Sequence, residues 1–189
     1  MEQGCALNLS QGFEFERTEQ HRKSKKLEET MVELYATLRP SLLSYAYQVI
    51  GSSGESEDLV QMAFLKLFDQ LNRDSCILNI RSWLYRVVHN LAIDHIRRNG
   101  IHELAVAEWL SQRARAENPP STEDKLIQQQ CIADSLQLLN ERERHCLLLR
   151  AEGLSYQEIG GVLGISSKAV SVYLARGLKK FEVRNENCA

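Results

Sequence analysis

Apolar residues recur at intervals of three and four along most of this chain, and little interrupts them. Its 189 residues include only three prolines and ten glycines, so long helices are expected. A strand would show β-branched residues alternating with polar ones between turn residues, and no such run is present. The sequence therefore predicts an all-α fold.

Three helices are predicted in the first half of the chain, over residues 27–50, 55–71 and 80–98. Pro40 is expected to kink the first helix or to mark a restart. Ser56 is the expected N-cap of the second helix, with acidic residues in the turn that follows. Met62 belongs to the predicted inward stripe of the second helix. Tyr85 faces away from the apolar stripe of the third helix and is expected to be exposed.

The segments between these helices divide the chain into two small helical domains. Residues 1–27 lack a sustained apolar period and end in a basic patch, which predicts a flexible leader. Residues 100–122 contain Asn-Pro-Pro-Ser-Thr and predict a flexible linker. The first domain has three or four helices, and the second has four, including a helix-turn-helix, over residues 123–139, 141–151, 155–163 and 166–183. The predicted organisation is leader 1–27, first domain 28–99, linker 100–122, second domain 123–184 and tail 185–189.

The segment from Ser155 to Gly177 has the spacing of a helix-turn-helix. Ser155 and Glu158 stand at the two positions of a capping box, three residues apart. Gly164 supplies the turn, and Ser166 caps the helix that follows. The pattern predicts two short helices around a tight turn, an arrangement found in many DNA-binding proteins.

The second of these helices has one apolar side and one basic side. At 100° per residue, Val170, Leu174 and Gly177 fall on one side and are expected to be buried. The other side suits the major groove of DNA, where side chains meet base edges and phosphates; it carries Lys168, Val172, Ala175, Arg176 and Lys179, with Ser171 at its margin. An ordinary helical hairpin with a solvated basic face is the alternative.

Blocks in both domains resemble bacterial sigma factors. Residues 139–155 (LNERERHCLLLRAEGLS) resemble the start of sigma region 4, and also the output domain of LuxR-type regulators. Residues 57–67 (EDLVQxxFLxL) resemble sigma region 2.2, and residues 83–98 (WLYRxxxNLAxDxxRR) resemble regions 2.3 and 2.4. No α/β receiver pattern of the LuxR type precedes the helix-turn-helix. The order of the blocks, with no region 3 between them, is similar to the extracytoplasmic-function (ECF) sigma factors.

The resemblance implies a transcription initiation factor that acts in the cytoplasm. Its implied partners are core RNA polymerase, promoter DNA and an anti-sigma factor, which a flexible linker would allow to clamp both domains. Region 2.2 docks on the clamp helices of the largest bacterial polymerase subunit, and the matching polar residues here are Glu57, Asp58 and Gln61. The resemblance implies no cofactor, no small-molecule substrate and no membrane insertion.

The resemblance also implies two DNA sites. The loop from Asn72 to Asn79, with Asn90 behind it, is the expected pocket for an unstacked base of the −10 element, and nearby arginines would hold phosphates. The expected −10 contacts are Arg73, Asp74, Ser75, Asn79, Arg81, Arg86, Asn90, Arg97 and Arg98. Region 4 would enter the major groove at the −35 element. The expected −35 contacts are Ser167, Lys168, Ser171, Val172, Ala175, Arg176 and Lys179.

Three positions depart from the family pattern. Gly160 stands where such motifs usually have Ala, at a cost of roughly 1 kcal/mol in a helix interior. Many members have a basic residue at the position of Ser171 and another at that of Tyr173, and this chain has neither. The base preference of the family therefore cannot be transferred to this chain.

Positive charge is concentrated where DNA is expected. The whole chain has 25 acidic and 23 basic residues, for a formal net charge of −2. Residues 80–98 nevertheless have a surplus of three cations, and residues 165–184 a surplus of four. Acidic residues such as Glu57 and Asp58 fall where a protein partner is expected. A sigma factor also needs less phosphate affinity of its own, because polymerase carries it to the promoter.

Other classes of protein are disfavoured by what the sequence lacks. The five cysteines form no CxxC pair, and His89 and His95 lie about 240° apart around a helix, so no metal site is expected. No phosphate-binding loop or catalytic constellation is evident, so no enzymatic activity is expected. No apolar run approaches the roughly 18 residues of a membrane span. The alternatives are a stand-alone LuxR-like helix-turn-helix transcriptional regulator, which would dimerise and bind an operator alone, and an interaction module that only titrates an anti-sigma factor.

Overall fold

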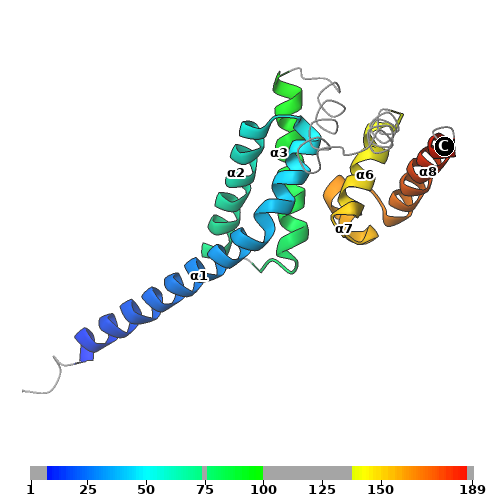
Figure 1. Ribbon diagram of the computed structural model, residues 1–189. Coiled ribbons are helices and arrows are strands. Elements are labelled where there is room, and N and C mark those ends of the chain that lie inside the picture. The colour runs from blue at the N-terminus through cyan, green and yellow to red at the C-terminus, as the bar shows by residue number, and fades with distance from the viewer. Residues whose placement is uncertain (1–7, 74–75, 100–137, 187–189) are drawn as a thin grey trace, which may run out of the picture.

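The computed structural model describes residues 8–73, 76–99 and 138–186, which form six α-helices and their short connections (Figure 1). The helices are α1 (Asn8–Ile50), α2 (Ser53–Asn72), α3 (Ile80–Asn99), α6 (Glu141–Ala151), α7 (Tyr156–Leu163) and α8 (Ser167–Glu186). The predicted all-α fold class is confirmed. The predicted linker and nearly all of the predicted helix over 123–139 lie outside the described residues. No helix in the described ranges has an apolar run long enough to span a membrane.

Helix α1 begins at Asn8, within the predicted flexible leader, and for residues 8–27 that prediction is wrong. This part of α1 projects away from the other helices (Figure 1). It is rich in Glu, Gln, Arg and Lys, which have high helix propensity. A helix that continues from a packed segment needs no nucleus of its own, so it forms here without an apolar period.

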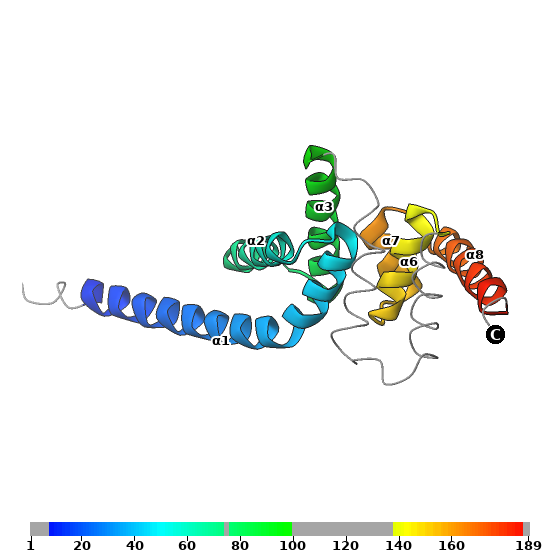
Figure 2. The same ribbon diagram turned by 45° about the horizontal axis from the view of Figure 1, so that its top comes forward.

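Helices α1, α2 and α3 form the N-terminal helical unit. Pro40 lies inside α1, and Figure 2 shows that helix bent between its blue and its cyan part. Of the two expectations for Pro40, a kink and a restart of the helix, the kink is the one observed. After the bend, α1 packs on α2 and α3. The core of this unit consists of residues that are almost completely buried: Leu42, Tyr45, Ala46, Val60, Ala63, Leu67, Leu84, Val88 and Ala92.

Two expectations about α2 are wrong. The helix begins at Ser53 with Ser52 as its N-cap residue, and Ser56 is buried in the first turn, where its hydroxyl donates to the Ser52 carbonyl oxygen at 2.5 Å. Met62 is 43% exposed. The side of α2 that packs inward carries Leu59, Val60, Ala63, Phe64 and Leu67. Met62 lies outside this stripe and therefore faces solvent.

Helices α6, α7 and α8 form the C-terminal helical unit, and its helix-turn-helix has the predicted caps. The Ser155 hydroxyl accepts a hydrogen bond from the Glu158 N–H, and the Glu158 carboxylate accepts one from the Ser155 N–H at 2.7 Å. Gly164 ends α7 in the left-handed conformation, with φ at 66°. The Ser166 hydroxyl accepts from the N–H of Ala169 at 3.1 Å and so caps α8. The predicted capping box, turn and cap are confirmed.

The turn between α7 and α8 explains the glycine at position 160. A Cβ atom on Gly160 would lie 2.6 Å from the carbonyl oxygen of Ile165. The backbones of these two residues are in direct contact, since the Ile165 N–H donates to the Gly160 carbonyl oxygen at 3.0 Å. Glycine therefore lets the turn fold back onto α7, which accounts for the departure from the usual Ala.

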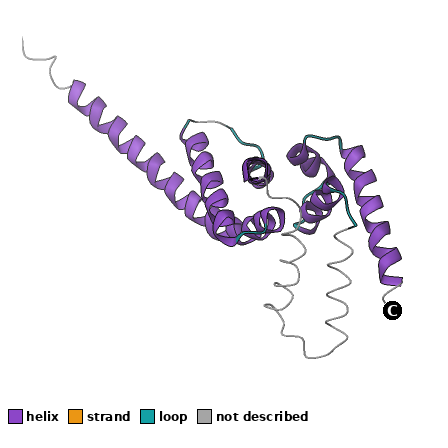
Figure 3. Cartoon of the chain, turned by 90° about the horizontal axis from the view of Figure 1, so that it is seen from above, coloured by secondary structure: helices purple, strands orange, loops and turns teal. Residues whose placement is uncertain are grey.

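The two units pack directly against each other, which the sequence pattern does not predict. Helix α7 lies against α3 and α6 against α1, and Figure 3 shows the two groups of helices side by side. Tyr85 of α3 is completely buried in this contact, and its hydroxyl donates to the Glu152 carboxylate at 3.0 Å. The expectation that Tyr85 is exposed is wrong, because the C-terminal unit covers its side of α3. Burial, followed by the negative charge of Glu152, raises the pKa of Tyr85 well above its usual value.

Two histidines also meet where the units join. The rings of His89 in α3 and His145 in α6 have centroids 5.0 Å apart and stand at 81° to each other. Nδ1 of His89 lies 2.9 Å from the Tyr45 hydroxyl oxygen. Burial lowers the pKa of His89 to about 4. Burial, followed by the nearby His89 and Arg144, lowers the pKa of His145 to about 3.

Gly160→Ala is expected to destabilise the protein by about 1–3 kcal/mol, because the added methyl group forces the Ile165 carbonyl and its turn away. Gly161→Ala is the matched control: a Cβ atom there meets nothing within 4 Å, and Ala is favoured over Gly in a helix by about 1 kcal/mol. Urea denaturation of both variants measures the difference. A Gly160→Ala variant as stable as Gly161→Ala would contradict this account of the turn.

Acidification is expected to destabilise the packed form of the chain. In the unfolded chain a histidine binds a proton near pH 6.5, whereas His89 and His145 do so in the folded chain only near pH 4 and pH 3. Since the unfolded state takes up protons first, the free energy of unfolding should fall as the pH drops below 6.5, by up to about 1.4 kcal/mol per pH unit for each histidine. Urea midpoints between about pH 5 and pH 8 measure this slope.

The matched variant for this pH dependence is His145→Phe. It keeps an aromatic ring against His89 but cannot bind a proton, so its stability should change less steeply below pH 6.5. Identical slopes for the variant and the wild-type chain would show that the histidine contact does not cause the acid sensitivity.

Candidate nucleic-acid interface

The outer side of α8 carries the residues expected to contact the −35 element. Val170, Leu174 and Gly177, on the opposite side, are buried as predicted. The expected contact residues are all exposed: Ser167, Lys168, Ser171, Val172, Ala175, Arg176 and Lys179. Val172, at 43% exposed, is a large apolar side chain among basic ones. Such a mixture suits thymine methyl groups, base edges and phosphates in a major groove.

Close packing fixes α8 against α6. A Cβ atom on Gly177 would lie 2.7 Å from Cδ1 of Leu147 in α6. A methyl group at Gly177 would therefore displace the Leu147 side chain, which packs against α8 at this point. Because Val170 and Leu174 are buried on the same side of α8, the basic side is held facing outward.

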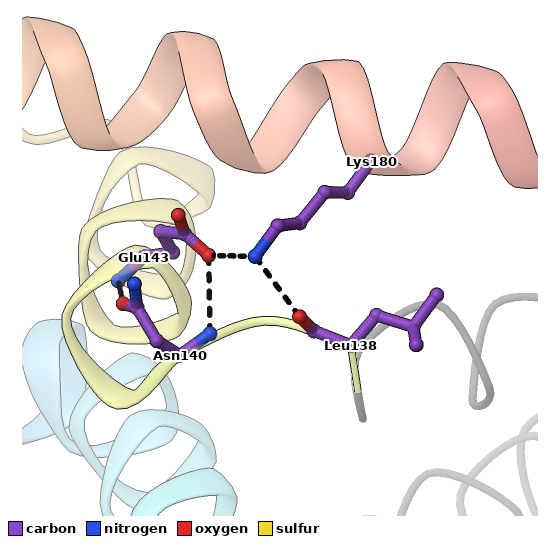
Figure 4. A network of polar contacts seen from close by, with 4 residues as sticks. All are labelled: Leu138, Asn140, Glu143 and Lys180. Atoms are coloured by element: carbon purple, nitrogen blue, oxygen red, sulfur yellow. Dashed lines mark hydrogen bonds and ion pairs between the residues drawn. The ribbon is translucent and has the colours of Figure 1, made fainter.

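An ion pair joins the same two helices further along (Figure 4). Nζ of Lys180 in α8 lies 2.6 Å from Oε2 of Glu143 in α6, and Lys180 also donates to the Leu138 carbonyl oxygen at 3.0 Å. The same Glu143 oxygen accepts from the Asn140 N–H at 3.0 Å, and the Asn140 side chain accepts from the Glu143 N–H at 2.8 Å. Glu143 is thus both the capping-box residue of α6 and the partner of α8.

The Glu143 carboxylate stays ionised although its residue is only 2% exposed. Burial by itself would raise its pKa, but hydrogen bonds from Lys180 and the Asn140 backbone, with the charges of Lys180 and Arg176, outweigh burial and lower it. Lys180 therefore has an anionic partner within the protein and is not part of the free basic face, although the sequence places it in that cationic segment. The sequence signal that could have revealed Glu143 is the capping-box spacing from Asn140.

The loop before α3 borders a hollow of about 470 Å³. Its lining includes Gln70, Cys76, Ile77, Leu78, Asn79, Trp83 and Arg86. An indole and a guanidinium on the wall suit an unstacked base, which aromatic and Arg side chains hold by stacking. Asn90 is exposed one helical turn beyond Arg86 and is not part of the lining, although it is expected behind the pocket. Arg73 is exposed at the C-cap of α2, and Asp74 and Ser75 lie outside the described residues.

Beyond the hollow, α3 presents an exposed polar stripe. Arg86, Asn90 and Arg97 are exposed and fall within about 40° of one another around the helix. The stripe is about 16 Å long at 1.5 Å per residue, and Arg98 is exposed beside its end. Asp94 lies 3.8 Å from Arg97. The two terminal arginines are therefore distant from the hollow but continue the line that starts there.

Two of the expected −10 residues are engaged within the protein. The Asn79 side-chain N–H donates to the Glu158 carboxylate of α7 at 2.7 Å. The Arg81 guanidinium donates to the backbone carbonyl oxygen of Glu152, and it lies 5.8 Å from the centroid of the Tyr85 ring. Both residues belong to the contact between the two helical units, which the sequence pattern does not predict.

The outer side of α2 carries the residues expected to dock on polymerase, and all three are exposed: Glu57, Asp58 and Gln61. Glu57 forms an ion pair with Arg39 of α1 at 2.6 Å. Met62 and Leu65 lie on the same helix and are 43% and 66% exposed. Large exposed apolar side chains that are surrounded by polar ones are typical of a protein–protein contact. Helical spacing assigned Met62 to the core and gave no role to Leu65, so the apolar part of this surface was missed.

Two family models match the chain, one in each helical unit. Sigma-70 region 2 matches residues 34–101, and Sigma-70, region 4 matches residues 129–181. The ferric citrate uptake sigma factor FecI of Escherichia coli (strain K12) is 30% identical over 153 residues, which cover 79% of this chain and 87% of FecI. The ECF RNA polymerase sigma factor SigW of Bacillus subtilis (strain 168) is 27% identical over 160 residues, which cover 78% of this chain and 82% of SigW.

Solved structures share the fold. CnrH, in complex with the cytosolic domain of CnrY, has a TM-score of 0.60 at 20% identity, over 89% of this chain and 96% of that one. The sigma factor RpoE from Bartonella quintana, in complex with the anti-sigma factor NepR, has a TM-score of 0.60 at 17% identity, over 84% of this chain and 98% of that one. Together with the matches to regions 2 and 4 and the identity with FecI over most of both chains, these findings show that the chain belongs to the family of ECF RNA polymerase sigma factors.

Proposed function

We propose that this sigma factor directs core RNA polymerase to its promoters through one DNA contact on each helical unit. The observation that carries the proposal is the exposed face of α8, where cations and small apolar side chains lie together on a helix-turn-helix. Such a helix suits the major groove of the −35 element. The ion pair between Lys180 and Glu143 holds it in position.

The N-terminal unit would capture the non-template strand of the −10 element. The hollow beside α3 would take one unstacked base, with Trp83 and Arg86 in its wall. Proteins that bind single strands combine such a stacking surface with a positively charged track for the backbone. The stripe from Arg86 to Arg97 supplies this track, and Asn90 lies within it. Holding a base outside the duplex would help to melt the element.

Polymerase would dock on the outer side of α2. Glu57, Asp58 and Gln61 supply its polar part, and Met62 and Leu65 its apolar part. Docking also explains how a chain of low net charge can act on DNA. Polymerase would bring the sigma factor to the promoter, so the chain need not supply all the affinity for phosphate.

We further propose that an anti-sigma factor controls the chain and that the chain acts in the cytoplasm. CnrH and RpoE adopt the same fold in their complexes with the cytosolic domain of CnrY and with the anti-sigma factor NepR. A partner that covered the side of α2 and the face of α8 would block polymerase and DNA together. The proposed activity is recognition and recruitment, and it requires no catalytic group or cofactor.

Run-off transcription on genomic fragments tests the proposed function. Purified core polymerase should give promoter-specific transcripts only when the chain is added, and the chain should bind core polymerase in the absence of DNA. Binding of an operator by the chain alone, with no effect on core polymerase, would instead identify a stand-alone helix-turn-helix regulator.

Arg176→Ala is expected to reduce discrimination at a single −35 position by about 1–3 kcal/mol, since an arginine in the major groove recognises a base edge. Transcript yields from matched and singly substituted promoters measure this. Lys179→Ala is the matched control, because it removes another exposed cation of α8; as a phosphate contact it should weaken all promoters alike. A uniform loss with Arg176→Ala would rule out its role as a base contact.

Leu65→Ser is expected to weaken binding to core polymerase by about tenfold, or about 1.4 kcal/mol, through the loss of an apolar contact. The side chain is 66% exposed, so the thermal midpoint of the free chain should not change. Val32→Ser is the control, because Val32 of α1 is equally exposed, at 69%. Direct binding of labelled chain to core polymerase measures both, and an equal effect of the two changes would refute the docking site on α2.

A further inference from the structure

We propose that Leu78 is a wedge that enters the non-template strand and fills the space left by the base that the hollow beside α3 takes out of the stack. The inference rests on the proposed function, because it takes that hollow as the site of an unstacked base. It adds an apolar contact with DNA to the polar contacts on α3.

Leu78 is the most exposed large apolar residue of the described part of the chain. Its side chain is 98% exposed, whereas the next two, Val32 and Leu65, are 69% and 66% exposed. It stands in the loop that joins α2 to α3, at one end of the N-terminal unit (Figure 1). Single apolar residues are common on protein surfaces. Leu78 differs from them in the anchoring of its loop and in its position beside the hollow.

The residues on both sides of Leu78 are anchored. Ile77 is half-buried and packs against the core. The side-chain oxygen of Asn79 accepts from the Ser82 N–H at 3.0 Å, and its backbone carbonyl oxygen accepts from the Trp83 N–H at 3.0 Å. The loop therefore presents Leu78 to solvent from a fixed backbone. A side chain held in this way loses less conformational entropy on binding.

Leu78 lies at the rim of the hollow. It belongs to the lining of this space of about 470 Å³, together with Trp83 and Arg86. Because it is also almost completely exposed, it stands at the opening and not on the inner wall. A base that enters the hollow leaves the strand beside this rim, and its former neighbours lose a stacking partner. An apolar side chain in the vacated space restores that contact and hinders the return of the base.

The charges around Leu78 favour DNA over protein as the partner. Arg73 is exposed at the C-cap of α2, where the same loop begins, and Arg86 is exposed on the wall of the hollow. Guanidinium groups on both sides of an apolar residue suit a strand whose phosphates flank its bases. Leu65, in contrast, shares its side of α2 with Asp58, whose carboxylate would repel such a strand.

Leu78→Ser in the full chain tests the wedge. The assay uses core polymerase and a duplex promoter mapped by run-off transcription, with a fluorescent adenine analogue in the −10 element that brightens when it leaves the stack. The variant should open this promoter at least about tenfold more slowly than the wild-type chain, because a short polar side chain cannot replace a stacked base. Leu78→Met, which stays apolar and long, should be within about twofold of the wild type.

A second template separates a wedge from an ordinary strand contact. Its −10 element is unpaired beforehand by mismatched bases in the template strand, so that little free energy is needed to extrude a base. The loss with Leu78→Ser should fall to about twofold or less on this template. Arg86→Ala is the comparison: it removes a contact with the strand itself, and the loss should therefore persist on both templates.

Val32→Ser is the matched control for the exposed apolar surface. Val32 lies on α1 and is also largely exposed, and its replacement should leave promoter opening unchanged. The thermal midpoints of the Leu78→Ser and Val32→Ser chains should both equal that of the wild type, since neither side chain is buried.

Three results would count against these proposals. Equal opening of the duplex promoter by Leu78→Ser and the wild-type chain, or an equal loss on the two templates, would overturn the wedge and leave the sigma function intact. Weaker binding of Leu78→Ser to core polymerase without DNA would assign Leu78 to a protein contact and overturn the wedge as well. Absence of promoter-specific transcripts with the wild-type chain would overturn the proposed function, and the wedge with it.

Discussion

The contact between α3 and the turn after α6 sets the relation between the two halves of this sigma factor. Tyr85 is buried there with its hydroxyl on Glu152, and Arg81 and Asn79 bond to the same turn. Among these groups Tyr85 is the buried one, and a buried hydroxyl needs a partner, which Glu152 supplies. Apolar packing accompanies these polar contacts, because the buried apolar residues of the two units belong to one cluster.

The presentation of α8 depends on two glycines and one ion pair. Gly160 lets the turn before α8 fold onto α7, and Gly177 leaves room for the Leu147 side chain of α6. Lys180 then ties α8 to Glu143, whose carboxylate also caps α6. Each of these contacts fixes the position of the helix without using a residue of its exposed face. The residues that hold α8 in place are therefore separate from those of its exposed face.

The charged residues on each surface of the chain match the partner that the surface would meet. The exposed cations of α8 and of the α3 stripe face the surfaces where DNA would lie, whereas the acids of α2 and of the turn after α6 meet protein groups. A formal net charge of −2 therefore says little about DNA binding, since fields that act over about a Debye length depend on local charge.

Features that depend on a few neighbouring residues were predictable from the sequence. Caps and turns act over three or four positions, so the capping box of Ser155 and Glu158 and the turn at Gly164 could be identified directly. Helical spacing likewise placed Val170 and Leu174 in the core. The two blocks of motif, each spanning consecutive helices, sufficed to indicate the family and hence the candidate DNA-facing residues.

Features that depend on which elements pack together were not predictable. Tyr85 is buried because the C-terminal unit covers it, Met62 is exposed because nothing described covers it, and Lys180 is paired because Glu143 lies on another helix. Periodicity tells which side of a helix is apolar but not what lies opposite, since the partners are distant along the chain. The amino-acid sequence therefore determined most of the helices and the apolar side of each one. The tertiary structure decided which elements pack together, and through them the hydrogen-bond partners of Asn79 and Arg81.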